Sequence, residues 1–225
     1  RSRFLAVFSG LLVAMLLASL DQTIFSTALP TIVGELNGVE HQLWVTTAYM
    51  LTATIMMPVY GKLGDLLGRK NLFIGAISIF LVGTVVGGSA ASMTALIAAR
   101  AIQGLGGGGL MILSQSIIAD VVPARDRGKY MGAMGAVFGL SSIIGPLLGG
   151  WFTESLSWRW AFWINVPLGL VAVAAAVIFL DLPRRRLTVA IDWRGIATMA
   201  VATSAIILIC AWGGHTYAWD SAQIL

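Results

Sequence analysis

The chain has 225 residues, of which 58% are hydrophobic and only 11% are charged, and its formal net charge is +4. A typical soluble domain carries about 25% charged residues, so this chain has too few polar side chains to cover a water-soluble globule. These values exclude a soluble enzyme, a disordered chain and a nucleic-acid-binding domain as first interpretations. They predict an all-α polytopic membrane protein in contact with the lipid bilayer, because each spanning helix needs about 20 apolar residues.

Seven apolar segments, taken in chain order, are long enough to cross a membrane. Short connections separate them, so consecutive helices are expected to run antiparallel. The segments cover about residues 4–29, 43–61, 72–91, 94–118, 130–152, 161–181 and 195–213.

Basic residues are concentrated in the loops on one side of this arrangement. Short loops rich in lysine and arginine favour the cytoplasm, so we expect a multi-pass plasma or inner membrane protein with a cytoplasmic N-terminus. That side carries Arg1, Arg3, Lys62, Arg69, Lys70, Arg125, Arg127, Lys129, Arg184, Arg185, Arg186 and Arg194, and the other side carries Arg159 alone. Tryptophans near the outer span ends are expected at the membrane interface; they are Trp44, Trp151, Trp158, Trp160, Trp212 and Trp219.

The connection at residues 61–70 reads Gly-Lys-Leu-Gly-Asp-Leu-Leu-Gly-Arg-Lys. Its glycines, Gly61 and Gly68 among them, allow a tight turn between closely packed helices. Asp65 is an acid in a basic loop, and it can cap a helix or neutralise a helix N-terminus. The alternative is a simple hairpin loop with cytoplasmic positive charge.

Span 4 contains Arg100 followed by the glycine-rich segment 104–109. An arginine at that depth costs several kcal/mol unless it finds a partner or water. Glycines allow another helix or a substrate to approach the backbone closely. The pattern Gly104-x-Gly106-x-x-Gly109 matches a dinucleotide-binding fingerprint in letters only, because no strand precedes it and it lies within a span.

Asp21, followed by Gln22, is the only acidic residue well inside a predicted span. A carboxyl group there indicates function, with a structural ion-pair partner or a polar residue near the outer rim as the alternative. Asp21 lies about 25 Å along an ideal helix from Phe4, and Arg100 lies about 9 Å into the oppositely directed span 4. Across a core about 30 Å thick both charges fall in the outer half, so we expect them to pair.

Span 5 carries the segment 141–150, Ser-Ser-Ile-Ile-Gly-Pro-Leu-Leu-Gly-Gly, preceded by a ridge of small residues. Pro146 removes a helix hydrogen bond and favours a kink. We therefore expect a bent helix packed tightly on a neighbour, with a role either in packing alone or also in conformational change. The ridge consists of Gly132, Gly135 and Gly139.

An internal repeat relates the two triplets of spans. The stretch from Gly61 to Arg69 has an acid four positions after its glycine, and the stretch from Gly150 to Arg159 repeats this with Glu154. The first copy joins spans 2 and 3 inside, and the second joins spans 5 and 6 outside. Equivalent loops on opposite faces are typical of the inverted repeats of secondary transporters.

These motifs together resemble the major facilitator superfamily and, within it, the fourteen-span drug/proton antiporters. Residues 61–70 are similar to the superfamily's loop 2–3 motif, and residues 100–109 to its span 4 motif. Residues 141–150 resemble the antiporter motif of span 5. Residues 20–30 and 157–167 are similar to the span 1 motif and the span 5–6 region of the fourteen-span subfamily.

The resemblance implies a set of gating and charge-relay residues. Asp65 would latch the cytoplasmic side against the other half of the transporter in the outward-open state, and Arg69 would join Asp120 in a charge relay. Leu66 stands where the family often has arginine, which removes one arm of that relay. The full set is Gly61, Asp65, Gly68, Arg69 and Asp120.

The resemblance also implies roles in coupling and binding. Arg100 would take part in proton coupling with Asp21. The motif residues Gly145, Pro146, Gly149 and Gly150 would shape span 5 at the helix interface that limits leak across the membrane. Ser141, at the first position of the motif, replaces a frequent glycine. The substrate cavity would be lined by spans 1, 2, 4 and 5, with Asp21, Gln22, Met56, Met57, Gln103 and Met111 as candidates.

The implied function is a proton-coupled multidrug efflux antiporter that exports amphipathic, often cationic, small molecules by rocker-switch alternating access. Protons would be the coupling ion, with no cofactor and no metal. Residues 1–182 would form an N-terminal six-helix half of the major facilitator fold, built of two inverted three-helix repeats. Residues 183–194 would be a basic cytoplasmic linker and 195–225 a seventh span with an outer loop, and the C-terminal half of the same protein would complete the cavity.

The main alternative is an exporter of a lipid or metabolite on the same fold. A uniporter is disfavoured by the antiporter-like motif of span 5. An intramembrane enzyme is disfavoured because His41 and His215 both fall in outer loops and Cys210 has no histidine at its depth. A seven-helix receptor would need its N-terminus outside.

Overall fold

In the computed structural model, residues 2–180, 192–214 and 217–221 are described, and within them the structure is helical. Seven helical segments of this part are long and apolar enough to cross a membrane, which confirms the predicted all-α membrane fold. Helices suit the bilayer because their backbone groups are hydrogen-bonded within each span. The elements are α1 (Ser2–Glu35), the 3-10 turn η1 (Val39–His41), α2 (Gln42–Leu67), α3 (Arg69–Gly88), α4 (Met93–Val121), α5 (Arg127–Ser155), α6 (Trp160–Trp163), α7 (Asn165–Phe179) and α8 (Trp193–Trp212).

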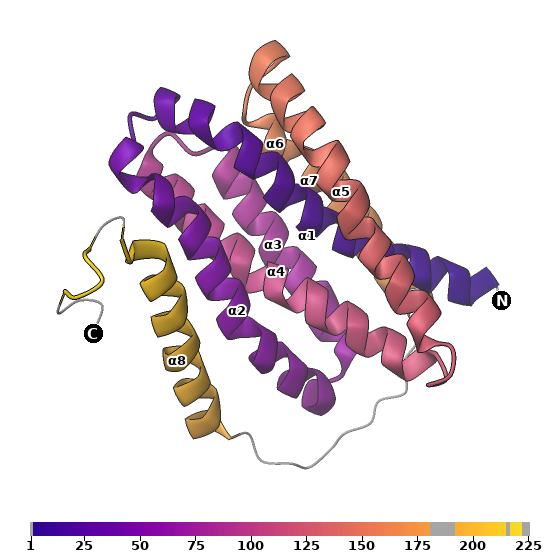
Figure 1. The fold of residues 1–225 in the computed structure, drawn as a ribbon. Coiled ribbons are helices and arrows are strands. Elements are labelled where there is room, and N and C mark those ends of the chain that lie inside the picture. Colours follow the sequence, from indigo (N-terminus) through magenta and orange to yellow (C-terminus); the bar gives the residue numbers. More distant parts are fainter. Residues whose placement is uncertain (1, 181–191, 215–216, 222–225) are drawn as a thin grey trace.

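The helices are paired reciprocally between the two halves of the six-helix bundle. Helix α4 of the second triplet packs on α2 and α3 of the first, while α1 of the first packs on α5 and α7 of the second (Figure 1). Helices α1 and α4 therefore have helix neighbours on more than one side. The two charges predicted to pair lie on these two helices.

Glycines of α4 permit its close approach to two neighbours. A methyl group at Gly104 or Gly108 would overlap backbone atoms of α2, and one at Gly106 would overlap backbone atoms of α3. No side chain could replace the hydrogen at these positions without moving a helix. The glycine-rich segment of span 4 therefore serves helix packing, as small residues commonly do in membranes.

The predicted connection at residues 61–70 is mostly helical, which corrects the expected loop. Helix α2 continues to Leu67, and Gly68 alone makes the turn into α3, with φ at +95°. A left-handed φ of this kind is accessible to glycine at little cost. Gly61 and Gly64 lie inside α2, where apolar packing on α4 continues the helix past its predicted end.

Helix α5 runs without interruption from Arg127 to Ser155 and includes Pro146, in agreement with the single span predicted there. The expected ridge packing is limited to part of the helix. Within 4 Å of a methyl group added at Gly132, Gly135 or Gly139, no atom of the described residues is found. Tyr130 packs against Phe4 and Phe8 of α1, but the close approach of the α5 backbone to α1 begins further along, at Gly145 of the antiporter-like motif.

The sixth span is divided at Ile164 into the short helix α6 and the longer α7. Trp158, just before α6, was expected at the membrane interface. It is fully buried instead, because its ring packs beside Phe162 in an apolar core cluster. Trp151 and Trp160 remain exposed, as an interfacial location requires.

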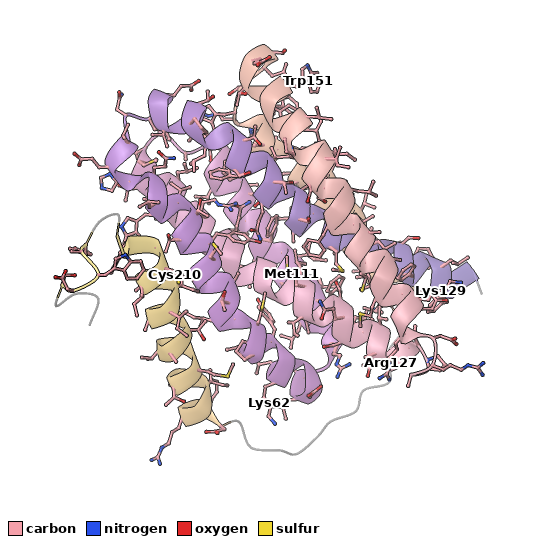
Figure 2. All side chains as sticks on the ribbon, in the orientation of Figure 1. Lys62, Met111, Arg127, Lys129, Trp151 and Cys210 are labelled. Carbon is pink, nitrogen blue, oxygen red and sulfur yellow. The ribbon has the colours of Figure 1, made fainter. Side chains whose placement is uncertain are left out.

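Basic side chains at one end of the bundle bind carbonyl oxygens at helix C-termini. Arg127 donates to the carbonyls of Ala119 and Val122 at the end of α4. Lys70 donates to the carbonyl of Val177 near the end of α7. Cations stabilise the negative end of a helix dipole, so these residues have a structural role at the helix C-termini. Lys62, Arg127 and Lys129 lie toward this end, and Trp151 lies at the other (Figure 2).

Helix α8 lies at the side of α2, and of the spanning helices it alone has no buried residue (Figure 1). The rings of Trp44 and Trp212 meet edge to face, with centroids 5.6 Å apart. Asp192 accepts a hydrogen bond from the backbone N–H of Gly195 and so caps the first turn of α8. Residues 181–191, which hold most of the predicted linker, lie outside the described residues.

Candidate functional site

Asp21 of α1 and Arg100 of α4 form an ion pair in the interior of the bundle, as their depths in the sequence predicted. The Arg100 Nη1 atom lies 2.5 Å from Asp21 Oδ2, and both side chains are almost completely buried. A charge buried alone in a membrane protein is costly, so each group offsets the desolvation of the other.

Three further polar side chains complete the cluster around this pair. Gln103 Nε2 donates to Asp21 Oδ1 at 3.1 Å, and Asn165 Nδ2 donates to the same oxygen at 2.8 Å. Gln103 also accepts from Arg100 Nη1 and donates to the hydroxyl of Thr84. Asp21 is thus held by one charged donor and two neutral donors, which come from α4 and α7.

Two aromatic rings enclose the guanidinium group of Arg100. Its Cζ atom lies 4.4 Å from the centroid of Phe25 and 4.3 Å from that of Tyr49. Cation–π attraction of this kind is strengthened where water is excluded. The two rings therefore hold the cation in place and shield the ion pair.

The cluster is not saturated with hydrogen bonds. Among the described residues, the buried atoms Arg100 Nε and Asn165 Oδ1 have no hydrogen-bond partner. Such atoms are few in folded proteins, and each carries a desolvation cost. A rearrangement that gave either atom a partner would recover part of that cost.

Helix α5 packs its motif against the stretch of α1 that follows Asp21. A methyl group at Gly145 would overlap the side chain of Thr23, and one at Gly149 would lie 2.8 Å from the carbonyl oxygen of Ile24. Gly150 is different, since no described atom lies within 4 Å of the methyl position there. Only part of the span 5 motif, Gly145 and Gly149, therefore packs against α1 next to Asp21.

A second charged cluster lies near the ends of α2, α3 and α4. Arg69 pairs with Asp65 at 2.8 Å and with Asp120 at 2.7 Å, and it also donates to the carbonyl of Ser116. These side chains are only partly buried. The contact between Arg69 and Asp120, which the resemblance implies, is present, whereas the pairing of Arg69 with Asp65 was not predicted.

The residues proposed to line a cavity fall into two groups. Gln22, Met56, Met57 and Met111 are partly exposed and come from α1, α2 and α4, while Asp21 and Gln103 are buried in the polar cluster. Met56 and Met111 also pack against the main apolar core. Met111 lies on the middle part of α4 (Figure 2).

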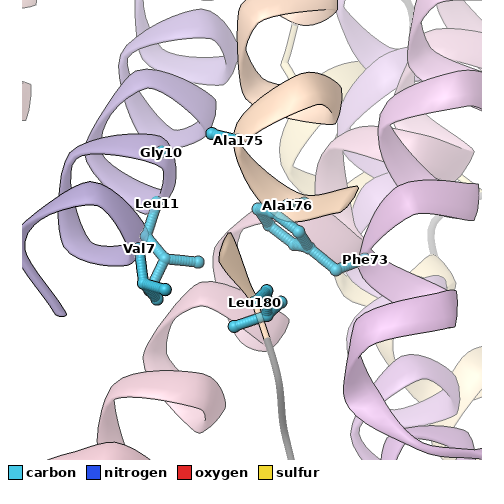
Figure 3. Close-up of a pocket in the computed structure, with 7 residues that line it drawn as sticks. All are labelled: Val7, Gly10, Leu11, Phe73, Ala175, Ala176 and Leu180. Atoms are coloured by element: carbon cyan, nitrogen blue, oxygen red, sulfur yellow. The ribbon is translucent and has the colours of Figure 1, made fainter. Parts of the chain in front are cut away.

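An apolar pocket is present elsewhere, between α1, α3 and α7. Its volume is about 10 Å³, and its lining includes Val7, Phe73 and Leu180 (Figure 3). A space of this size barely holds one water, and an apolar lining offers no partner for it. The pocket is too small for a transported molecule and lies apart from the buried ion pair.

Sequence reasoning missed four members of the central cluster: Phe25, Tyr49, Thr84 and Asn165. The depth calculation used for Asp21 would have found two of them. Thr84 lies 15 residues into α3, about 22 Å along the helix, and Asn165 lies five residues into the sixth span, about 8 Å from its start. Since these two spans run in opposite directions, both residues fall in the same half of the bundle, the half in which the depth calculation places Asp21 and Arg100. The aromatic pair carries no comparable signal.

The spanning helices and the buried ion pair define a multi-pass membrane protein with a cluster of polar side chains inside its helix bundle. The family model of the Major Facilitator Superfamily matches residues 11–222. The chain belongs to this superfamily.

Similar proteins carry transporter names. An MFS-type transporter of Mycobacterium tuberculosis is 47% identical over 219 residues, which are 97% of this chain and 32% of that protein. The multidrug transporter protein MdtP of Bacillus subtilis is 42% identical over 225 residues, 100% of this chain and 42% of that protein. The human organic anion transporter MFSD10 has the same fold, with a TM-score of 0.72 at 20% identity, over 97% of this chain and 58% of that one. The chain thus spans less than half the length of these two sequence relatives.

Proposed function

We propose that this chain is the N-terminal part of a proton-coupled multidrug efflux antiporter. It would comprise one six-helix half and the first extra span of a fourteen-span transporter. The relative named as a multidrug transporter supports the substrate class, amphipathic and often cationic small molecules. The observation that carries the coupling is the buried pair of Asp21 and Arg100, because a carboxyl group in a dry interior can exchange its proton when its partner moves.

The mechanism follows from the contacts of Asp21. While Asp21 is ionised, it holds Arg100 and Gln103 of α4 against α1. Protonation removes the charge that attracts Arg100, and the guanidinium then needs another partner or water. Binding of a cationic substrate near Asp21 would compete for the same carboxylate, so that proton, substrate and Arg100 exclude one another.

The rest of the transport cycle needs the C-terminal half. Gln22, Met56, Met57 and Met111 would line one wall of the cavity, and methionines suit varied apolar ligands because their side chains are flexible. Asp65 would latch the cytoplasmic side to the other half, as the resemblance implies, with Arg69 and Asp120 holding it in place. The two halves would then rock about the fixed site between them.

Transport by the full-length protein in proteoliposomes with an imposed pH gradient tests the proposal. Asp21→Asn should abolish gradient-driven export of a cationic dye, while Glu40→Gln, which removes an exposed carboxylate from η1, should leave export intact. The exchange of the two charges, Asp21→Arg with Arg100→Asp, should restore part of the export that either single change destroys. Unchanged export by Asp21→Asn would refute the site, and export of lipids or metabolites but no cationic dye would favour the alternative substrate class.

The proposed orientation places the N-terminus in the cytoplasm. A reporter fused before residue 1 of the full-length protein should be active only on the cytoplasmic side. A reporter that is accessible from outside the cell would overturn this orientation and exchange the two ends of the bundle.

A further inference from the structure

A carboxylate and two aromatic rings, all from helices other than its own, surround the Arg100 guanidinium. They are the Asp21 carboxylate and the Phe25 ring of α1 and the Tyr49 ring of α2, and we call these three side chains the cation box. All three are almost completely buried. Since Arg100 comes from α4, the walls of the box and the group that fills it belong to different helices. A movement of α4 or of the Arg100 side chain can therefore empty the box.

The chemistry of the cation box suits organic cations in general and not arginine alone. The guanidinium carbon lies 4.4 Å from the ring centroid of Phe25 and 4.3 Å from that of Tyr49, so both rings attract it. Aromatic faces attract other organic cations in the same way, and a buried carboxylate supplies the opposite charge. A guanidinium or amidinium group of a small molecule carries the same planar, delocalised charge and so meets the same attraction.

Arg100 fills the cation box with many of its donors unused. A guanidinium group has five N–H donors. Among the described residues both of its hydrogen bonds come from Nη1, to Asp21 and to Gln103. The Nε atom is buried and has no partner there, which costs free energy. A small-molecule cation that is not tethered to α4 can orient its donors more freely, so it can compete with Arg100 for the box.

The cation box also lies beside more exposed parts of α1 and α2. The residues that follow its three members in the chain are Gln22, Ser26 and Met50, and each of these is partly or fully exposed. Neighbouring residues of a helix point about 100° apart, so each wall residue lies next to exposed surface of its own helix. Gln22 is among the residues proposed to line the substrate cavity, and the box therefore borders that cavity.

We propose that the cationic head of a transported molecule binds in the cation box in place of the Arg100 guanidinium, with its charge beside Asp21 and its flat face against Phe25 and Tyr49. The inference rests on the proposed function, in which the substrate is a cation, and adds the place of binding and a preference for guanidinium and amidinium heads. Arg100 is then an internal competitor of the substrate. Its removal should strengthen substrate binding, although it removes a residue of the site.

The test is equilibrium binding to the purified full-length protein in detergent, measured by calorimetry. The probe is phenylguanidinium, and the neutral phenylurea is its control for shape. Arg100→Ala should bind phenylguanidinium about tenfold more tightly than the unchanged protein, and phenylurea no more tightly. Arg159→Ala is the matched control, because Arg159 also stacks on a ring, that of Trp158, but donates to a backbone carbonyl. This control should leave the affinity for phenylguanidinium unchanged.

The two rings distinguish competition from a merely structural role. In Arg100→Ala, adding Phe25→Leu or Tyr49→Leu should weaken phenylguanidinium binding by about tenfold. With Arg100 present, either ring substitution should have a smaller effect, because the same ring holds both the competitor and the ligand. Arg100→Gln offers Asp21 a neutral donor and should show the same gain in affinity, so a folding defect of Arg100→Ala does not decide the outcome.

Competition with a fluorescent cation relates the cation box to transport. Phenylguanidinium should displace ethidium from the unchanged protein, and Arg100→Ala should bind ethidium more tightly. A gain for phenylguanidinium without competition against ethidium would indicate a gap left by the substitution only and would overturn the inference. Unchanged or weaker binding of phenylguanidinium in both Arg100 variants would do the same. Because binding needs no pH gradient, full export by Asp21→Asn would refute the proposed coupling, while the binding results would still decide the inference.

Discussion

Trp158 donates its indole N–H to the carboxylate of Glu35 across 2.8 Å, and so joins the α5–α6 connection to the last residue of α1. At the opposite end of the bundle, Arg69 joins the α2–α3 connection to Asp120 near the end of α4. Trp158 follows Gly150 by as many positions as Arg69 follows Gly61. The two triplets thus keep an equivalent contact to an acid while they use chemically different donors.

The contact between Trp158 and Glu35 can be tested with a substitution that keeps an aromatic side chain at position 158. Trp158→Phe should lower the free energy of unfolding of the full-length protein by about 1–3 kcal/mol, because a hydrogen bond to a charged but exposed acceptor is lost and the smaller ring leaves space in a fully buried site. Denaturant titration in detergent measures the change. Trp160→Phe removes an indole N–H from an exposed ring and should have a smaller effect; equal effects would contradict the role of the Glu35 contact.

The Arg69–Asp120 pair is partly exposed, so its contribution to stability should be small and sensitive to salt. A double-mutant cycle with Arg69→Ala and Asp120→Ala should give a coupling energy of about 0.2–1 kcal/mol at low salt and less at high salt. Thermal unfolding of the four proteins at two ionic strengths supplies the measurement. A coupling energy that salt leaves unchanged would indicate that the pair is more deeply buried in the full transporter.

The packing of α5 on α1 predicts different outcomes for two glycines of one motif. Gly145→Ala should cost about 1–3 kcal/mol of stability and reduce transport, since its methyl group would overlap the side chain of Thr23. Gly150→Ala should be tolerated, because the space there is open toward the described residues. Adding Thr23→Ala should restore part of the stability lost in Gly145→Ala. Equal losses at both glycines would show that the α1–α5 contact is not the cause.

The position of α8 can be checked by cross-linking, because Cys210 is the single cysteine of the chain. In a Cys210→Ser background, cysteines that replace Trp44 and Trp212 should be joined efficiently by a short bifunctional reagent, since the two rings are in contact. Cysteines that replace Trp44 and Trp193 should not be joined by the reagent, because Trp193 lies about 28 Å from Trp212 along α8. Cross-linking of the second pair alone would place α8 in the opposite direction beside α2.

Much of the fold could be predicted from hydrophobicity alone. Seven long apolar segments give seven spans, since a bilayer leaves the backbone few alternatives to a helix. The span ends were less predictable, because polar residues such as Lys62 and Asp65 extend α2 beyond its apolar part, where contacts with α4 support it. The continuity of α5 through Pro146 was predicted, since a long apolar segment runs across the proline on both sides.

The site was predictable where a single charge had a single possible partner. Asp21 and Arg100 were matched by depth, because isolated charges within spans must find each other or water. Asn165 and Thr84 are neutral and lie among many other polar residues of the spans. Burying a neutral side chain costs less than burying a charge, so the sequence does not distinguish these two residues from the others. The enclosure of Arg100 by Phe25 and Tyr49 depends on how three helices face one another, which the pattern of one sequence does not specify.

The wide spacing of the Asp21 partners has a consequence for how the protein is made. Arg100 lies 79 residues and Asn165 lies 144 residues after Asp21. At synthesis rates of about 5–20 residues per second, the nascent α1 waits roughly 4–16 s for Arg100 and about twice as long for Asn165. During that time its carboxyl group lacks the partners that offset its burial, so α1 is expected to remain within the translocation machinery. Release of α1 into lipid is therefore expected to be delayed until the ribosome has completed α4.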